Sequence, residues 1–378
     1  DADFFMSQIK PFDLFNDRLY RISIYKTPTG VYLFRDIHHI VFDGMSTVVF
    51  DRELARAYDG EQTVGETFTT LDHAAEQSDF KDSPLWYKAE AYYADLLDSA
   101  ENVPYPHIFD DEVPWQGDEA NSKESVTITF DAPAIDAFCA SNNLTVNNYF
   151  MTCMMEVLHS VTREEKIVAT AIYHGREDMR VLGNIGMYVT TLPIVSSRKE
   201  KLPFADNARR MQEDFTATVA VAAYPFTDIA AKWGIKPHIL YAYQDMAGLA
   251  SMDGDTASFN SRGANIDILA ALNKAKTPIE FNVHRNADGN YTLDLNYDAT
   301  RYSRRDIETF ADMVINVATT APAGEIKLLS PKQEQHVMTI GRGKDLPYDV
   351  TETWVDLFLR QAAATPDSMV VADRDTSL

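Results

Sequence analysis

The stretch that decides the fold of this chain is HHIVFDGMS, residues 38–46. It follows two short runs that alternate apolar and polar side chains, LYRISI at 19–24 and VYLFRDI at 31–37, with Pro28-Thr29-Gly30 between them. Alternation with a period of two is typical of half-buried strands, and a Pro-Gly segment is typical of a turn. We therefore predict a β-hairpin that ends at the two adjacent histidines.

A helix is predicted directly after this stretch, over residues 45–58. Neighbouring side chains of a strand point to opposite faces, so His38 and His39 are expected to differ, one facing a cleft and the other the interior. An imidazole at the end of a strand suits general acid-base chemistry, because its unperturbed pKa is about 6.5. A metal site at His38, His39 and Asp43 is disfavoured, since the two rings diverge and no Cys or Glu stands in the stretch.

The rest of the chain mixes helical and strand patterns. Helical spacing of apolar residues covers 83–99, 132–142, 145–160, 204–222 and 304–319. Strand patterns cover 124–130, 166–173, 238–243, 279–283 and 291–297, with Asp288-Gly289 as a hairpin turn between the last two. This mixture predicts an α/β sandwich in each half of the chain. A polar segment with one short helix begins near residue 321, before a helix at 354–363 and a strand at 369–372.

The composition is that of a folded, acidic protein. The chain has 378 residues, of which 45% are hydrophobic and 24% charged, and its net charge is -23. This content supports a buried core, and the length suggests two units of about 150–200 residues each. Nucleic acid is disfavoured as a partner, because its phosphates call for a basic surface.

The sequence carries no recognisable targeting signal. Its opening, DADFFMSQIK, lacks the regions of a signal peptide, and it has no run of about 18 apolar residues that could cross a membrane. Cys139 and Cys153 lie in apolar helical patterns and are expected to be buried, unpaired thiols. We expect a soluble, cytoplasmic protein without a membrane partner, and we expect both ends to continue in a longer chain.

Other catalytic motifs are absent from the sequence. It has no Gly-x-Ser-x-Gly elbow and no phosphate-binding Gly-Lys-Ser/Thr loop, and the glycine-rich residues 183–186 are more typical of a turn. Nine histidines occur, and the seven outside the adjacent pair, His73 and His159 among them, are assigned structural or surface positions.

The stretch HHIVFDG resembles the His-His-x-x-x-Asp-Gly signature of non-ribosomal peptide synthetase condensation domains, within the chloramphenicol acetyltransferase-like superfamily. The order of further stretches makes this resemblance specific. Similar family runs match Pro11–Leu14 (PFDL), His174–Arg176 (HGR), Ile185–Pro193 (IGMYVTTLP) and Tyr224–Phe226 (YPF). Phe281–Tyr297 is similar to the closing hairpin of the second lobe, and Leu328–Pro366 to the joint into an adenylation domain. The resemblance covers essentially the whole chain.

The resemblance implies an α/β fold of two chloramphenicol acetyltransferase-like sandwich lobes in a V-shaped pseudo-dimer, with the active site in a tunnel between them. The first lobe is expected to be incomplete, because the family's opening motifs are missing. The implied division is a partial N-terminal lobe over residues 1–112, a C-terminal lobe over 113–325, a linker over 326–352, and the start of an adenylation domain over 353–378.

The implied activity is that of an acyltransferase, which forms an amide bond between a donor acyl or peptidyl thioester and an acceptor aminoacyl thioester. Donor and acceptor peptidyl carrier proteins would deliver both groups on 4'-phosphopantetheine arms, while the domain itself binds no cofactor and no metal. An adenylation domain is the implied neighbour in the same chain. By the same resemblance His39 is the catalytic imidazole, which positions or deprotonates the acceptor amine.

The resemblance also assigns supporting roles within the motif. His38 is expected to be a packed, hydrogen-bonded ring. Asp43 is expected to pair with an arginine, either Arg176 or one in the missing segment, and to hold the architecture. Gly44 is expected where the pantetheine arm passes, and Ser46 is either a cap of the following helix or a site residue.

Departures from the family pattern leave other functions open besides condensation. Thr190 stands where Asn is usual, Val221-Ala222-Ala223 replaces a His-Gln-Asp-like triplet, and Lys236-Pro237-His238 is what remains of an Arg-Asn-Pro motif. These departures favour a non-catalytic, condensation-like docking domain, whereas the intact HHIVFDG argues against it. An epimerization domain shares the signature but tends to carry Trp soon after the serine, where this chain has Thr47 and Val48. Heterocyclization is disfavoured, because that family has Asp in place of the signature histidines.

Overall fold

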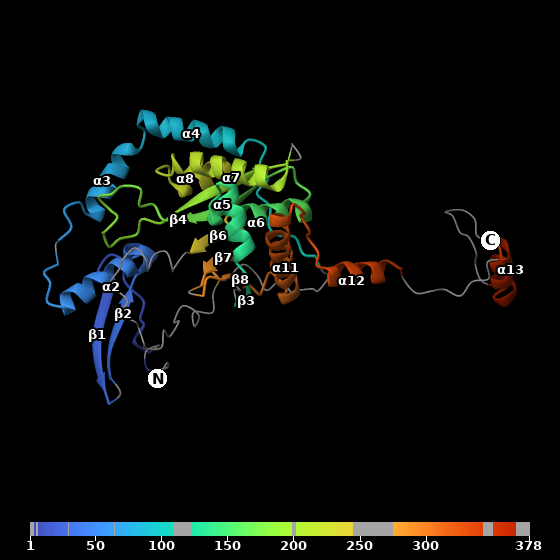
Figure 1. Ribbon diagram of the computed structural model, residues 1–378, viewed down its shortest axis with the longest axis horizontal. Helices are drawn as coiled ribbons and strands as arrows, with labels where there is room; N and C mark the ends of the chain where they lie inside the picture. Colours follow the sequence, from blue (N-terminus) through green and yellow to red (C-terminus); the bar gives the residue numbers. More distant parts are fainter. Residues whose placement is uncertain are drawn as a thin grey trace. The chain divides into compact units, whose positions relative to one another are not determined.

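The computed structural model describes residues 4, 7–28, 30–63, 65–108, 122–198, 202–244, 275–286, 288–342 and 351–367. The chain forms two compact units, residues 1–328 and residues 329–378. Figure 1 shows the elements of both units, and the sheets and all the candidate site residues belong to the first unit.

The hairpin predicted from alternation is present. β1 (Tyr20–Thr27) pairs antiparallel with β2 (Gly30–Ile37) over their full lengths. The short 3-10 turn η1 (His39–Val41) and the helix α2 (Gly44–Tyr58) follow directly. The HHIVFDG stretch therefore forms a tight connection between a strand and a helix.

A six-stranded mixed sheet forms the centre of the first unit. Its strands are β3 (Lys123–Phe130), β4 (Lys166–Tyr173), β5 (Thr190–Ser197), β6 (Ile239–Gln244), β7 (Ile279–Arg285) and β8 (Tyr291–Asp298). They lie in the order β3-β8-β7-β6-β4-β5, with β6 parallel to β4 and β7 and the other neighbours antiparallel. Pro193, which lacks a backbone N–H, fits in β5 because this strand lies at the sheet edge.

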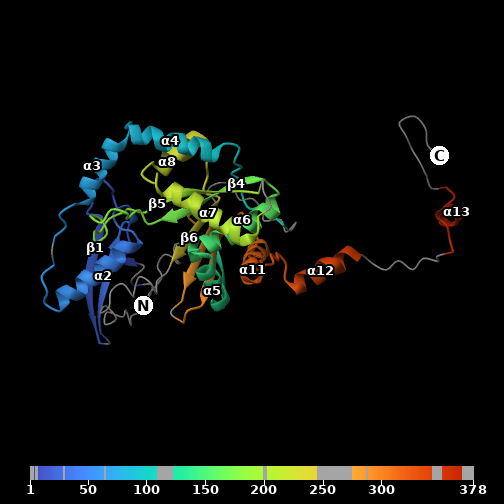
Figure 2. The same cartoon turned by 45° about the horizontal axis from the view of Figure 1, so that its top comes forward.

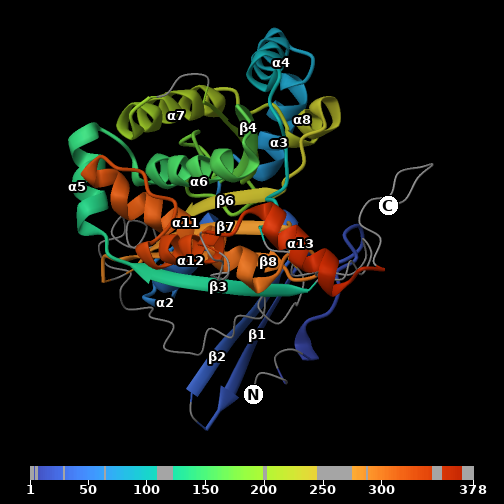
Figure 3. The same cartoon turned by 90° about the vertical axis from the view of Figure 1, so that its right-hand side faces the viewer.

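Helices pack around α6 (Val146–Thr162), the long apolar helix of the sequence. α6 contacts α5 (Pro133–Asn142), α7 (Phe204–Val219) and α11 (Arg304–Thr320), as Figure 3 shows. Every residue of α6 from Asn148 to His159 is buried, which its nearly continuous apolar sequence predicts. From the sheet, Phe281 packs on Phe310 of α11 with ring centroids 5.7 Å apart. α11 ends in the short 3-10 turn η3 (Ala321–Ala323).

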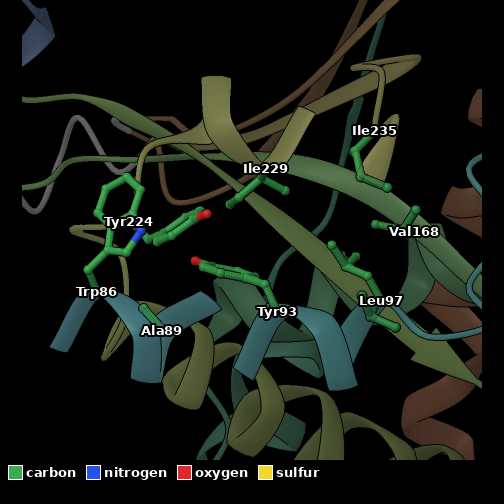
Figure 4. Close-up of a cluster of buried hydrophobic side chains, with 9 residues drawn as sticks. Trp86, Ala89, Tyr93, Leu97, Val168, Tyr224, Ile229 and Ile235 are labelled. Atoms are coloured by element: carbon green, nitrogen blue, oxygen red, sulfur yellow. The ribbon is translucent and has the colours of Figure 1, made fainter. Parts of the chain in front are cut away.

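An aromatic cluster packs the helix α4 (Pro84–Leu97), which lies in the chain between the hairpin and the six-stranded sheet, against that sheet. Helices α3 (Thr70–Phe80) and α4 follow α2, and Figure 2 shows α4 alongside α8 (Phe226–Trp233). In Figure 4, Trp86 and Tyr93 of α4 face Tyr224, and the Trp86 and Tyr224 ring centroids are 4.3 Å apart. Val168 of β4 belongs to the same cluster. α4 therefore packs on the six-stranded sheet, although its residues fall in the range predicted for the N-terminal lobe; the predicted domain boundaries stay predictions.

The second unit contributes two helices, α12 (Pro331–Arg342) and α13 (Trp354–Ala364). The strand predicted at 369–372 lies outside the described residues. Among the described helices, none is long and apolar enough to cross a membrane.

The mixed α/β class is confirmed, and most predicted elements are present with ends shifted by a few residues. The sandwich predicted for the first half is not seen, because the described residues before α4 form a sheet only at the β1–β2 hairpin. The V-shaped arrangement of two lobes stays a prediction. Cys139 and Cys153 are buried and unpaired, as expected.

Candidate active site

The two histidines follow the hairpin without continuing it. β2 ends at Ile37, and His38 caps η1 through its Nδ1, which accepts a hydrogen bond from the Ile40 N–H at 3.0 Å. The half-buried His38 ring packs edge-on against Phe12, with centroids 5.8 Å apart. His38 is thus the packed, hydrogen-bonded ring that the sequence predicts. Strand alternation does not set the directions of the two rings, however, because β2 ends at Ile37 and His39 lies in a 3-10 turn.

His39 is exposed, and a hydrogen bond to the backbone orients its ring. Its Nδ1 lies 2.8 Å from the carbonyl oxygen of Phe42. A carbonyl oxygen can only accept, so Nδ1 carries the hydrogen. In the neutral ring, Nε2 then has a free lone pair, which is the form that a general base needs.

Asp43, and not Ser46, caps helix α2. Oδ1 of Asp43 accepts hydrogen bonds from the backbone N–H and from the hydroxyl of Ser46, both at 2.8 Å. The alternative in which Ser46 caps the helix is therefore wrong: Ser46 lies inside the first turn, three residues after the carboxylate that satisfies its N–H. The buried Ser46 hydroxyl also lies 2.9 Å from both the N–H and the carbonyl oxygen of Gly186.

A buried ion pair joins this helix start to the loop that follows β4. Nη2 of Arg176 lies 2.9 and 3.1 Å from the two carboxylate oxygens of Asp43, and their side chains are 1% and 0% exposed. Arg176 is therefore the arginine partner that the sequence left between two alternatives. Burial raises the pKa of Asp43, but hydrogen bonds from Arg176, Ser46 and the Tyr188 backbone outweigh it and hold the pKa below its ordinary value. The carboxylate is charged at neutral pH.

The loop between β4 and β5 is shaped to fit over this pair. The Tyr188 N–H donates to Oδ2 of Asp43 at 3.1 Å, and the Asp43 N–H donates to the Gly186 carbonyl at 3.2 Å. The Tyr188 ring also packs on the Arg176 guanidinium, 4.4 Å from its Cζ. Gly175 has a φ of +65°, and a Cβ there would collide with the Tyr188 carbonyl oxygen, so this approach requires glycine.

The same loop is fastened to α3 and the residues before it. The Asn184 side-chain amide donates to the Phe68 carbonyl at 2.5 Å. Arg180 makes two hydrogen bonds of 2.8 Å to Glu76, and its guanidinium lies 4.0 Å above the Phe68 ring. Segments more than 100 residues apart in sequence are thus held together around the His38–Ser46 stretch.

Gly44 is exposed and has open space where a side chain would begin, since no described atom lies within 4 Å of an ideal Cβ. Its φ is not in the left-handed region, so the turn itself does not require glycine. Within the described residues, no three His, Cys, Asp or Glu side chains gather as metal ligands.

Sequence reasoning missed the partners that the loop supplies. Gly186 and Tyr188 stand in the matched run IGMYVTTLP, yet no pattern in the sequence shows that they contact Ser46 and Asp43, because these contacts span about 140 residues. The helix α3 was missed too, although Thr69 and Asp72 form a capping box, which is a local signal of a helix start.

Comparison with known families agrees with this fold. Residues 2–337 match the model of the family described as "Condensation domain". The chain belongs to the condensation-domain family.

Its curated relatives are synthases of peptide antibiotics. Bacitracin synthase 3 of Bacillus licheniformis is 25% identical over 385 residues, which cover 98% of this chain and 6% of that protein. Gramicidin S synthase 2 of Aneurinibacillus migulanus is 23% identical over 387 residues, which cover 98% of this chain and 8% of that protein. The chain thus spans less than a tenth of the length of these relatives.

Solved structures with the same fold include three kinds of domain. The X-domain from teicoplanin biosynthesis has a TM-score of 0.68 at 17% identity, covering 85% of this chain and 76% of its own. The first condensation domain of the calcium-dependent antibiotic synthetase, in complex with a substrate analogue, has a TM-score of 0.64 at 16% identity, covering 86% and 75%. The epimerization domain from the third module of tyrocidine synthetase B has a TM-score of 0.61 at 16% identity, covering 85% and 75%. At these identities the likeness concerns the fold alone.

Proposed function

We propose that this chain is an acyltransferase that joins two carrier-bound thioesters through an amide bond in non-ribosomal peptide synthesis. The observation that supports it is the ring of His39, which sits exposed in the family's HHxxxDG stretch with Nδ1 bonded to the Phe42 carbonyl at 2.8 Å. This arrangement leaves Nε2 free to accept a proton.

In the proposed step, the acceptor's amine nitrogen attacks the carbonyl carbon of the donor thioester. A C–N bond forms and the C–S bond breaks, so the donor's pantetheine thiolate leaves. His39 Nε2 takes the proton that the amine loses and passes it to that thiolate, which balances the charge. The thioester is already activated, so positioning supplies much of the acceleration and general-base help about 10²–10⁴-fold.

Asp43, Arg176, Ser46 and His38 act in this proposal as positioning residues, because each makes hydrogen bonds that fix the turn and none is exposed. The open space beside Gly44 suits a pantetheine arm. The proposal extends to donor and acceptor carrier proteins as partners, to a tunnel between two lobes, and to an adenylation domain that begins near residue 353.

A non-catalytic docking domain is the second candidate, and one observation favours it. Val221, in the triplet that departs from the family pattern, packs against the aromatic cluster of Trp86 and Tyr224 and has no group for acid-base chemistry. The fold shared with the X-domain from teicoplanin biosynthesis fits either candidate.

Product analysis separates the candidates. The protein is incubated with donor and acceptor carriers loaded with thioesters, and the products are analysed by mass spectrometry and chiral chromatography. An amide product whose stereocentres are unchanged supports condensation. Inversion at the donor Cα without amide indicates epimerization, and binding of carriers without any product indicates docking; either result contradicts the proposal.

A further inference from the structure

A pocket of about 260 Å³ borders the candidate active site and is not used in the proposed chemistry. Its walls come from three segments: the turn η1, the helix α3, and the loop before β5. Ile40 and Val41 of η1 follow His39 directly in the chain, so the pocket adjoins the turn that carries the proposed base.

The α3 wall is formed by one face of the helix. Thr70, His73, Ala74 and Gln77 follow the spacing i, i+3, i+4, i+7, which places them on one side. The His73 ring packs against Tyr188, with ring centroids 5.2 Å apart. In the described part of the chain, neither the His73 imidazole nor the Gln77 carboxamide makes a side-chain hydrogen bond, so both groups are available to a ligand.

The lining from η1 and from the loop before β5 is largely apolar. It includes Ile40, Val41, Ile185 and Met187. Sites for drug-sized molecules hold roughly 300–1,000 Å³. A volume of about 260 Å³ lies just below that range, so the pocket has room for an amino-acid side chain and is small for a whole tethered peptide. A side chain that fills it buries apolar groups against these residues and needs a polar tip where it meets His73 and Gln77.

Charged groups near the pocket limit which polar group the end of a bound side chain can carry. Glu76 and Asp178 both interact electrostatically with His73, and both are already paired with Arg180. With the Arg180 guanidinium, the two carboxylates leave one net negative charge near His73, which disfavours a carboxylate tip relative to a neutral one.

We propose that this pocket receives the side chain of one of the two acyl groups, and that His73 and Gln77 select a neutral, hydrogen-bonding tip, either a carboxamide or a hydroxyl. The selection follows from the cost of leaving polar groups unpaired: a ligand of equal shape without the tip takes water from His73 and Gln77 and returns no hydrogen bond. This inference rests on the proposed amide-forming function.

Equilibrium binding tests the pocket without turnover. The probes are aminoacyl pantetheine amides, in which a stable amide replaces the thioester, carrying glutamine, methionine or glutamate, and affinity is measured by calorimetry. The wild-type chain is expected to bind the glutamine probe about tenfold more tightly than the methionine or glutamate probe. His73→Leu and Gln77→Leu should each reduce the glutamine-to-methionine ratio to threefold or less. His336→Leu, which changes an exposed histidine of α12, should leave the ratio unchanged.

Equal affinity of the wild-type chain for the glutamine and methionine probes, or binding of none of them, overturns the proposal. A preference that survives in both α3 variants overturns it as well; Gln77 is exposed, so its replacement removes no buried packing. A preference that depends on His73 without any amide product supports the pocket and contradicts the proposed condensation. Amide formation at a rate that does not depend on the side chain supports the proposed condensation and contradicts the proposed pocket.

Discussion

Replacing Asp43 by Ala is the change whose consequence the structure defines best. The substitution removes the carboxylate that Arg176 faces and leaves a guanidinium that is 1% exposed without its counter-charge. It also removes the cap of α2 and the acceptor of the Tyr188 N–H. Both the buried charge and the lost hydrogen bonds favour the unfolded chain, and the loop around the proposed base loses its anchor.

The expected loss in the free energy of unfolding follows from the burial of the Asp43–Arg176 pair. Removing one partner of a buried ion pair costs about 3–5 kcal/mol. For the first unit of 328 residues, an unfolding entropy of about 2.1 cal/mol/K per residue gives about 0.7 kcal/mol/K, so the melting temperature should fall by about 4–7 °C. Replacing both partners, as in Asp43→Ala with Arg176→Met, should recover part of this loss, because no unpaired charge stays buried.

Thermal unfolding of the wild type, both single variants and the double variant measures this coupling, and amide formation is assayed alongside. Glu308→Ala is the matched control, since its pair with Arg304 is about half exposed and is worth at most about 0.5 kcal/mol. A single Asp43→Ala variant that melts like the wild type would refute the reasoning. If that variant were also inactive, Asp43 would have a direct chemical role.

Three further predictions follow from other described contacts. Gly175→Ala should lower the free energy of unfolding, measured by chemical unfolding, by at least about 1–3 kcal/mol, because it places a Cβ on a left-handed backbone and against the Tyr188 carbonyl oxygen. A change below about 0.5 kcal/mol, one tenth of a typical stability, would contradict this. Burial lowers the pKa of His159, so the unfolded chain binds a proton at this ring more readily than the folded chain does. The free energy of unfolding should therefore fall as the pH drops below about 6.5, and His159→Gln should weaken this dependence. A free energy of unfolding that rises in the wild type over this pH range would count against it. Burial raises the pKa of both Cys139 and Cys153, so neither thiol should react with a thiol reagent at pH 7 until the chain is unfolded, and rapid native labelling would show the helices packed otherwise.

The elements that could be predicted from sequence are those whose pattern matches their burial. β4 has the predicted ends, and α6 was predicted as buried throughout, because a continuous apolar run leaves few alternatives. β5 was not predicted as a strand: Pro193 in its middle argues against one, and only its position at the sheet edge makes the proline acceptable. α3 has no buried residue, so the apolar stripe that marks other helices is missing there.

The sequence predicted site contacts only where the two residues are close in the chain or both belong to stretches that resemble the family's motifs. Through the resemblance, the sequence left Arg176 as one of two candidate partners of Asp43, and the structure shows these two residues paired. It did not show that η1 interrupts the strand before His39, because a 3-10 turn of three residues leaves no periodic signal. The bonds from Ser46 to Gly186 lie between distant segments, and no spacing rule reaches across them.

The most direct test of the central claim is the single-turnover rate of amide formation by wild type and His39→Ala, with loaded donor and acceptor carriers at saturating concentration. His336→Ala serves as the matched control, since it alters an exposed histidine of the second unit. If His39 is the base, the rate should be at least about 100-fold lower for His39→Ala, with an unchanged melting temperature and a control rate equal to that of the wild type. A His39→Ala variant that forms the amide at the wild-type rate would contradict the assignment of His39 as the base.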